Sequence, residues 1–485
     1  MNEAKHIVYS ITINIIVEIF IMQILFIPHG NIQYSQLHPE RREWVIRNSY
    51  EKLFDLLIQN PAYKIGFEAS GETIKAIAEL CPDVLEKLNS LLKQGKVEAI
   101  GSPHTHIMLS NIDPEIGLES LKHGIQTWEK YTGHKPKVGW NPECSWADFI
   151  PDIFKEAGFE ALVMDGDSFM LSFKEVREAT KLHFDVRGHS NKNKLFLIED
   201  YIKDKPDLLK YFTNPSKAPN GLQLLFRSDC MANPMLWYLM GATEGHRESL
   251  VKISEISQSL SRWKERIENT GSFILPYAED AEYIGTSAYF YVKQFGQARF
   301  FEEEAASIQR FEELLQTAVQ GGYTLSTPSE IIGNAKEILP NEHISKVENG
   351  IAWHGGTAKA WANTVYARIM DPVCYSIFKG IKSIAETQNL TIPTLEGTLR
   401  EALRKVTSAY VSDSRWPPAP TSPGRFNVEE SLRDLDEANA LMRKAMEELG
   451  LSDQKMLYSP GLMQSQINSI RDELMGLEYF GEKKE

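Results

Sequence analysis

Two acidic residues far apart in the chain are of the kind that act together on a glycosidic bond. Glu143 lies in GWNPECSW (139–146), where flanking tryptophans make its carboxylate costly to desolvate. Asp280 lies in a second acidic cluster, AEDAEY (278–283). Cleavage of a glycosidic bond uses two carboxyl groups. One attacks the sugar or activates a water molecule, and the other, with a raised pKa, protonates the leaving oxygen. The two acids therefore predict this chemistry, and the alternative is that each one caps a following helix.

Aromatic residues accompany both acids. Trp140 and Trp146 flank the first acid, and Tyr277 and Tyr283 flank the second. Rings of this kind offer flat apolar faces. We therefore expect them to stack on sugar rings and to bind substrate.

Three histidines follow predicted strands. His29 lies in IPHGN, and His104 and His106 form an H-x-H pair in GSPHTH. Alternation along a strand places both members of an H-x-H pair on one side, so that with His29 they are able to bind zinc. H-x-H is a weak metal signal, and no H-E-x-x-H run accompanies it. We therefore favour neutral histidines that hydrogen-bond a polar substrate over a metal site.

Other ionisable residues have simpler interpretations. Arg227 and Asp229 in LLFRSD lie on one side of an extended segment, where they form either a buried ion pair or contacts to substrate hydroxyls. We favour the ion pair for Arg227. Asp165 and Asp167 in MDGDS are explained by a turn. Cys144 has no readable histidine partner, so we expect it to pack in the core.

Seven short apolar runs recur along the chain, each ending in polar or ionisable residues. They span residues 24–31, 63–71, 97–106, 138–146, 161–168, 222–230 and 272–282. Runs of this length suit strands that are buried on both faces. The segments between them, such as 82–95 and 149–159, have helical periodicity and glycine stop signals. Alternation of strand and helix predicts parallel βαβ units.

Chemical residues at the end of every run favour an α/β fold of the (β/α)7 type, a distorted TIM-like barrel. The alternative, a doubly wound open sheet, would gather its polar residues at one switch point. No G-x-G-x-x-G or Walker sequence follows a strand, which also argues against that sheet. In a barrel the active site lies at the carboxyl ends of the strands.

The sequence pattern divides the chain into three parts. Residues 1–21 are an apolar extension, residues 22–300 the predicted barrel, and residues 301–485 a series of amphipathic helices expected to form a C-terminal α-helical bundle. Residues 323–332 predict one last strand and the start of a helix. The proline-rich loop 414–426 is too apolar for a simple linker, so we expect it to fold over the barrel mouth.

The N-terminal segment allows two interpretations. Residues 7–28 are long and apolar enough to suggest a membrane helix, yet polar residues interrupt them and QILFIPHGN suits the first barrel strand. We therefore expect translation to begin at Met22. The alternative is an interfacial or membrane anchor.

Composition limits the partners and the compartment. The net charge is −14, from 52 basic and 66 acidic residues, which argues against nucleic acid or an anionic membrane surface as the main partner. The four cysteines include no C-x-x-C pair and suit a reducing cytoplasm. The oligomeric state is not readable from these features.

The motifs, taken in order, resemble glycoside hydrolase family 57. WNPECSW is similar to the family's W-x-P-E motif, which implies that Glu143 is the nucleophile. EDAEYIG is similar to its D-A-E-x-x-G motif, which implies that Asp280 is the general acid/base. The resemblance covers residues 22–300 most closely. It implies a seven-stranded barrel followed by a helical region, and retaining chemistry without a metal or other cofactor.

The same resemblance implies substrate-binding residues. GSPHTHIML is similar to a segment with a substrate-contacting histidine, which corresponds to His106. PHGNIQYS corresponds to the opening H-Q-P motif, of which it keeps only His29. LLFRSD resembles an F-R-D run, and VSDSRWPP resembles the last motif, with Asp413 and Trp416 as implied substrate contacts.

The expected function is that of a retaining glycoside hydrolase or transglycosylating enzyme acting on an α-linked glucan or related oligosaccharide. Two alternatives remain open. One is a metal-dependent polysaccharide deacetylase, in which His104, His106 or His29 would hold zinc with an aspartate. The other is a carbohydrate-binding barrel without catalysis.

Overall fold

The structure is a computed structural model, and it describes residues 22–34, 37–183, 194–241, 249–268, 270–286, 303–352, 357–415, 426–452 and 458–477. The expected N-terminal extension and loop residues 416–425, including Trp416, lie outside this part of the chain. Every other residue for which the sequence predicts a role in the site lies within it.

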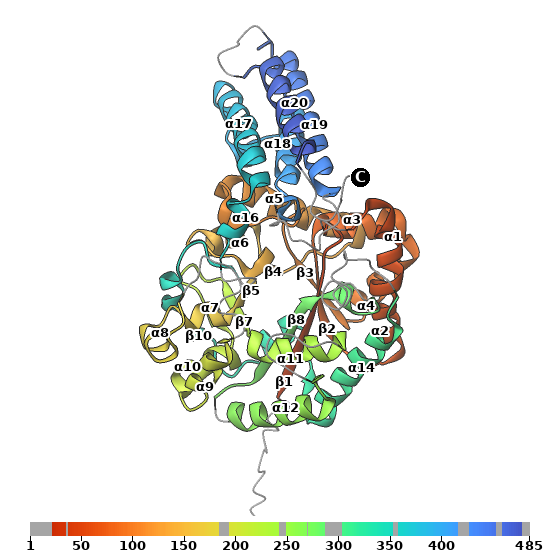
Figure 1. Ribbon diagram of the computed structural model, residues 1–485, viewed down its shortest axis with the longest axis vertical. Helices are drawn as coiled ribbons and strands as arrows, with labels where there is room; N and C mark the ends of the chain where they lie inside the picture. Colours follow the sequence, from red (N-terminus) through yellow and green to blue (C-terminus); the bar gives the residue numbers. More distant parts are fainter. Residues whose placement is uncertain are drawn as a thin grey trace, which may run out of the picture.

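Seven parallel strands form the barrel wall (Figure 1), one in each predicted apolar run. They are β1 (Gln23–Gly30), β2 (Ile65–Ala69), β3 (Val97–Gly101), β4 (Val138–Trp140), β5 (Ala161–Asp165), β7 (Gln223–Arg227) and β8 (Phe273–Asp280). Each pairs in parallel with its neighbour in the order β7-β5-β4-β3-β2-β1-β8. Nearly all of their residues are buried, as expected for strands covered on both faces. The predicted barrel is confirmed.

Short strands complete the sheet and mark where the wall closes. β6 (Ser216–Lys217) runs antiparallel to β7, and β10 (Leu339–Pro340) pairs with β6. Closure between β7 and β8 uses side chains, since Arg227 Nη2 of β7 lies 2.8 Å from Glu279 Oε1 of β8. This side-chain seam is where the wall departs from a regular barrel.

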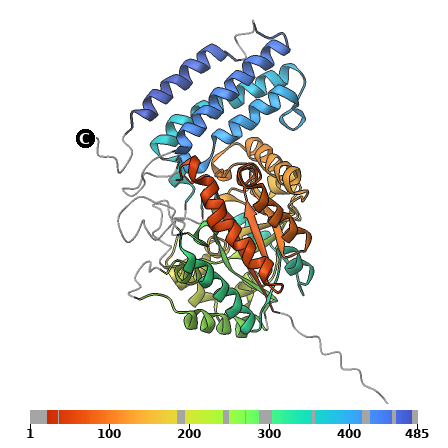
Figure 2. The ribbon, with the colours of Figure 1, turned by 90° about the vertical axis from the view of Figure 1, so that its right-hand side faces the viewer.

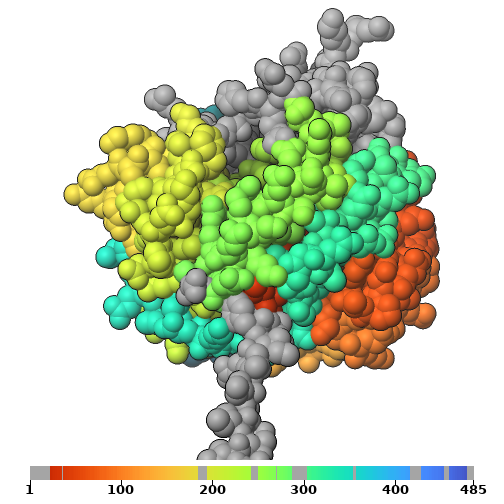
Figure 3. Space-filling view, turned by 90° about the horizontal axis from the view of Figure 1, so that it is seen from below, coloured from red at the N-terminus to blue at the C-terminus, as the bar shows by residue number. Residues whose placement is uncertain are grey.

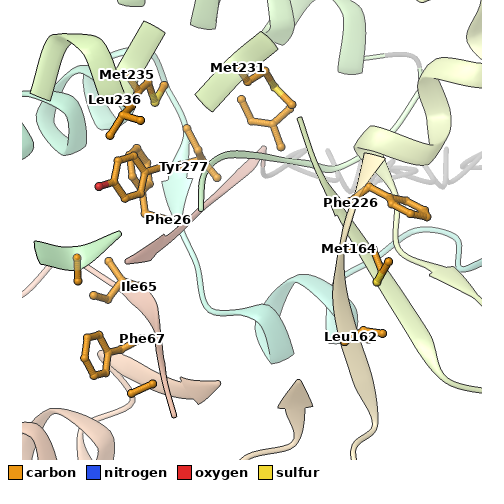
Figure 4. Close-up of a cluster of buried hydrophobic side chains, with 14 of the residues drawn as sticks. Phe26, Ile65, Phe67, Leu162, Met164, Phe226, Met231, Met235, Leu236 and Tyr277 are labelled. Atoms are coloured by element: carbon orange, nitrogen blue, oxygen red, sulfur yellow. The ribbon is translucent and has the colours of Figure 1, made fainter. Parts of the chain in front are cut away.

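Alternate side chains of the strands point to opposite faces of the wall. The inward-facing apolar set fills the barrel and includes Leu25, Ile27, Ile100, Val138, Val163, Leu225, Leu275 and Ala278. The outward-facing set packs on helices, and Figure 4 shows Phe26 and Tyr277 beside Met235 and Leu236 of helix α11 (Asp229–Met240). Tyr277 and Phe26 stack with ring centroids 5.9 Å apart. Tyr277 therefore lies in the helix-facing layer and not at the barrel mouth, where stacking on a sugar would require it.

Helices follow one another around the wall. They are α1 (Arg42–Val45), α2 (Glu51–Gln59), α3 (Gly71–Leu80), α4 (Pro82–Lys93), α5 (Pro114–Thr132), α6 (Ile150–Ala157), α7 (Gly166–Met170), α8 (Lys174–Thr180), α9 (Phe196–Ile202), α10 (Pro206–Thr213), α11 and α12 (Ile253–Ile267). Figure 3, seen from below, shows the colours passing from yellow through green and blue-green to red around the barrel. The helices predicted in residues 82–95 and 149–159 are α4 and α6.

The barrel continues beyond the predicted boundary at residue 300. Helix α14 (Ala305–Gln320) packs on the wall, where Phe311 contacts Phe26 with ring centroids 6.1 Å apart. Strand β9 (Thr324–Leu325) pairs with β1 and leads into α15 (Pro328–Gly333), as the sequence predicts for residues 323–332. The amphipathic pattern of α14 did not distinguish a helix covering a barrel from a helix of a bundle, because both bury one apolar face.

The C-terminal helices form a bundle at one end of the barrel (Figures 1 and 2). They are α16 (Lys359–Ala362), α17 (Val365–Thr387), α18 (Gly397–Ala409), α19 (Phe426–Glu448) and α20 (Pro460–Met475). Ile107 and Ile116 of the barrel part join the apolar core of this bundle. Within the described residues, no helix is both long enough and apolar enough to cross a membrane.

Candidate active site

On three neighbouring strands, the row of inward-facing side chains, here called a column, ends in an ionisable residue. On β1 the column Leu25, Ile27 is followed by His29, which is the register partner of Glu68 on β2 and of Asp280 on β8. Apolar residues fill the barrel up to this level, so the three polar groups lie together at its carboxyl end. This is the end at which barrels carry their active sites.

His29 is a buried, positively charged group at the centre of this row. Its Nδ1 pairs with Glu68 Oε2, and both side chains are almost fully buried. Burial alone would lower the pKa of His29, but the charge and hydrogen bond of Glu68 outweigh it. With the nearby carboxylates of Asp280 and Glu282, they raise the pKa of His29 to about 10. His29 is therefore an imidazolium at neutral pH, and not the neutral hydrogen-bonding group that the sequence suggested.

Aromatic rings connect this row to the strand that precedes Glu143. The indole of Trp140, at the end of β4, stacks on His29 with centroids 5.4 Å apart and an interplanar angle of 25°. The ring of His106 also lies beside His29, with centroids 5.3 Å apart and an interplanar angle of 47°. Trp140 and Trp146 are 0% and 1% exposed. We had expected both indoles to stack on sugar rings. In this structure both are packed within the protein, and neither offers a free face.

Glu143 stands on a tight turn that directly follows β4. The 3₁₀ turn η4 (Pro142–Cys144) places Glu143 at φ 57° and Cys144 at φ 44°, in the left-handed region. The side-chain amide of Asn141 donates to the carbonyl of Ser145 and supports the turn. Glycine at 139 allows the strand to approach helix α6, because a Cβ there would lie 2.6 Å from Phe154.

That turn is strained, and Glu143 is the partly exposed residue in a buried segment. Non-glycine residues in the left-handed region cost on the order of 1–3 kcal/mol each and cluster at active sites. Glu143 is half-buried, whereas its neighbours 140–142 and 144–146 are all buried. The following helix α6 has Phe149 at its N-cap position and no side-chain cap hydrogen bond. The capping alternative therefore does not explain Glu143.

Asp280 shows the same pattern at the end of β8. It is half-buried, while residues 272–279 and 281–286 are buried. It precedes the 3₁₀ turn η6 (Ala281–Tyr283) but makes no side-chain cap hydrogen bond to it. Both acids are thus the partly exposed members of otherwise buried segments at the carboxyl end of the barrel.

Glu282, which the sequence did not single out, lies fully buried two residues after Asp280. Its Oε1 accepts hydrogen bonds from the Asn31 backbone N–H at 2.8 Å and from the Tyr50 hydroxyl. Burial, followed by the charge of Asp280, raises the pKa of Glu282 to about 8. The sequence indicated Glu282 only as the third acid of AEDAE. Its partner Tyr50 is remote in sequence, and no pattern predicted it.

A segment of the bundle completes one side of the site. In the 3₁₀ turn η10 (Ser412–Arg415), the Ser412 hydroxyl lies 2.8 Å from His106 Nδ1. The side-chain amide of Asn31 donates to Asp413 Oδ2 at 3.1 Å. The structure therefore brings Asp413, His106 and His29 together. Trp416 lies outside the described residues.

His104 does not join the other histidines. The H-x-H pair follows β3 in a loop, so strand alternation does not apply, and the expectation that both rings point to one side is wrong. His104 stacks on His123 with centroids 3.7 Å apart and bonds Thr127 at 3.1 Å, in a separate cavity of about 490 Å³. No group of three or more His, Cys, Asp or Glu residues in the described ranges is arranged to hold a metal ion.

A buried charge cluster stabilises the opposite side of the barrel mouth. Arg227 is 0% exposed and lies 2.7 Å from Asp229, 2.8 Å from Glu279 and 3.6 Å from Asp165. Burial and the charge of Asp229 raise the pKa of Asp165. The predicted buried ion pair is confirmed, and Cys144 is buried next to it, where burial raises its thiol pKa.

Replacement of Arg227 by methionine should lower the free energy of unfolding by about 3–5 kcal/mol, because it leaves buried carboxylates without their cation. Urea unfolding measures this loss. Lys137→Met is the matched control, since Lys137 pairs with Glu160 at 3.1 Å while both side chains are well exposed. A screened surface pair of this kind contributes little. Equal losses in the two variants would contradict the role given to Arg227.

Comparison with known proteins decides the family. A sequence model of glycosyl hydrolase family 57 matches residues 21–336. The chain belongs to glycosyl hydrolase family 57. The matched range includes Glu143 and Asp280, and it ends beyond α15, in agreement with a barrel that continues past residue 300.

Related sequences match over a limited region. An α-amylase of Pyrococcus abyssi is 30% identical over 131 residues, covering 26% of this chain and 20% of that protein. A 4-α-glucanotransferase of Thermococcus litoralis is 28% identical over 131 residues, with the same coverage of 26% and 20%. The match thus spans about a fifth of the length of these relatives.

Two solved enzyme structures share the fold over almost the whole chain. The branching enzyme of Pyrococcus horikoshii has a TM-score of 0.59 at 15% identity, covering 92% of this chain and 94% of that one. The α-amylase AmyC of Thermotoga maritima has a TM-score of 0.57 at 12% identity, covering 95% and 98%. At these identities the likeness is one of fold.

The charge of His29 should make this family 57 protein less stable as the pH rises. Its pKa is about 10 here against a usual 6.5, so the native state holds the proton more tightly than the unfolded state. The stabilisation is complete below pH 6.5 and is lost as the pH rises through about 10, with a slope of at most about 1.4 kcal/mol per pH unit. Urea unfolding across this range should show a shallower slope for His29→Gln. The exposed His38→Gln should keep the wild-type slope, and a wild-type slope in His29→Gln would refute the assignment.

Proposed function

We propose that this protein is a retaining enzyme that acts on an α-linked glucan or a related oligosaccharide by double displacement. Glu143 attacks the anomeric carbon while Asp280 protonates the departing oxygen, and a glycosyl ester forms on Glu143. Asp280 then acts as a base and takes a proton from water or from a sugar hydroxyl, which resolves the ester with net retention. This chemistry predicts carboxyl groups about 5–5.5 Å apart in the substrate complex.

One observation carries the proposal. Glu143 and Asp280 are the partly exposed acids of two otherwise buried segments, and both stand at the carboxyl end of the same barrel. Trp140, at the end of the strand before Glu143, stacks on His29 of β1. His29 is in turn the register partner of Asp280 on β8. Membership of family 57 and the α-glucan enzymes among the relatives support the choice of substrate class.

An activated fluoro-sugar provides the direct test of covalent catalysis. Incubation with 5-fluoro-α-glucosyl fluoride should add one fluoroglucosyl group to the peptide that contains Glu143, as measured by mass spectrometry. Sugar binding without labelling would favour a carbohydrate-binding barrel without catalysis. Stoichiometric zinc together with acetate release from an acetylated polysaccharide would favour a deacetylase.

Product analysis would then define the substrate. Incubation with a panel of α-glucans and α-galactosides identifies the sugar and the linkage, and the balance of shortened and lengthened chains separates hydrolysis from transfer. Failure to convert any α-glycoside in the panel would overturn the proposed activity.

The cytoplasm is the compartment we favour for this reaction. All four cysteines are free thiols, and three of them are buried. Such residues suit a reducing environment.

A further inference from the structure

The segment that brings the bundle to the active site is held from behind by one arginine. The turn η10 follows helix α18 and presents Ser412 to His106 and Asp413 to Asn31. On the other side of the turn, the guanidinium of Arg415 is buried, with 4% of the residue exposed. Arg415 therefore stands two residues from the carboxylate that faces the site.

Arg415 bonds three groups of the turn and of the preceding helix end. Its Nη1 donates to the carbonyl oxygens of Ala409 at 2.7 Å and Val411 at 3.3 Å, and to the Ser414 hydroxyl at 2.7 Å. Ala409 is the last residue of α18, where carbonyls have no partner within the helix. The guanidinium thus fixes the path of the chain from the helix end into the turn.

The same guanidinium ties the turn to a second helix of the bundle. Its Nε donates to Asp371 Oδ1 of α17 at 2.7 Å, and Nη2 lies 3.5 Å from the sulfur of Cys374. An arginine fork supplies five N–H donors in a fixed plane, which a lysine ammonium cannot reproduce. The requirement for several divergent donors at one buried point is therefore specific to arginine.

We infer that Arg415 is a positioning residue for the active site: it holds η10 so that Asp413 meets Asn31 and the barrel mouth. The inference rests on the proposed function, and it makes the bundle a part of the site rather than an appendage. Arg415 itself lies behind the turn and acts through Asp413. Its loss therefore weakens substrate binding through Asp413, while Glu143 and Asp280 stay in place on the barrel.

A double-mutant cycle with maltooligosaccharides tests this coupling. Arg415→Met should lower kcat/KM by about tenfold to a hundredfold, mainly through KM, because misplacement of a binding group by about 1 Å has effects of this size. Asp413→Asn should have a similar effect. In the Asp413→Asn background, Arg415→Met should change kcat/KM by less than about twofold, since residues that act through one another are not additive. Arg415→Lys should restore little of the loss.

Control variants separate positioning from folding. Arg400→Met removes another arginine between bundle and barrel, which bonds Glu119 at 3.1 and 3.0 Å, and should leave KM unchanged. Asp371→Asn removes only one contact of Arg415 and should raise KM by a smaller factor, even if Arg415→Met folds poorly. Additive effects in the cycle, or an equal rise of KM in Arg400→Met, would overturn the inference alone. A wild-type protein that neither binds nor converts an α-glucan would overturn the proposed function, and the inference with it.

Discussion

Glu143→Ala is expected to reduce turnover of α-glucans by a factor on the order of 10⁴ or more, because removal of a covalent nucleophile eliminates the only route to the glycosyl ester. The fold should persist, since Glu143 is half-buried and lies on a turn closed by the backbone of its neighbours. The glutamate side chain is not part of the apolar core, so its removal should leave core packing intact. Steady-state kinetics with a maltooligosaccharide, together with the melting temperature, measures both quantities.

Rescue of Glu143→Ala by azide makes this prediction specific to the nucleophile. With α-glucosyl fluoride as substrate, fluoride leaves without an acid, and azide can occupy the space of the missing carboxylate. Azide should displace fluoride from the face opposite to the departing group and give the β-glucosyl azide. The matched control is Asp148→Ala, because Asp148 is an exposed acid in the same loop and should be dispensable. Full activity of Glu143→Ala, or a rescue product of α configuration, would remove Glu143 from the mechanism.

The barrel was predictable because its signal is local. Each strand is an apolar run that ends in polar residues, and both features are properties of consecutive residues. The two acids were readable for the same reason, since each one ends such a run. In particular, the column from Leu25 to His29 on β1 can be predicted without knowledge of distant partners.

The partners of the site residues were not predictable, because they depend on strand register and helix packing. Glu68 pairs with His29 only through the alignment of β1 and β2. Glu68 is a lone acid on the inward side of an apolar strand, and that was the only sequence signal for this pairing. Tyr50, which binds Glu282 from a π-helical turn (Ile46–Tyr50), gave no signal at all.

Tryptophans were the weakest part of the sequence interpretation. An indole beside an acid suits a sugar platform and a packing residue equally well, and only burial distinguishes the two. Trp140 is fully buried and stacks on the ring of His29, so in this structure it is a packing residue.

Asp280→Ala is expected to slow cleavage of natural glucans by about 10²–10⁴-fold, because the leaving oxygen then departs without a proton. With α-glucosyl fluoride the first step should remain fast, since fluoride needs no proton. The second step lacks its base, so the glycosyl ester on Glu143 should accumulate and give a burst of fluoride. Azide needs no base, and it should release the sugar as the α-glucosyl azide, the opposite configuration to that expected from Glu143→Ala.

Glu282 is the rival for the acid role, because its pKa of about 8 suits a proton donor at neutral pH. Access argues against it: Glu282 is 0% exposed and its carboxylate is occupied by Asn31 and Tyr50, whereas Asp280 is half-buried and faces the mouth. Burial and the charge of Asp280 raise the pKa of Glu282, so Glu282→Gln mimics the protonated form of Glu282. The cleavage rate of Glu282→Gln should therefore depend on the leaving group as the wild-type rate does, whereas that of Asp280→Ala should depend on it more strongly. A leaving-group dependence confined to Glu282→Gln would transfer the acid role to Glu282.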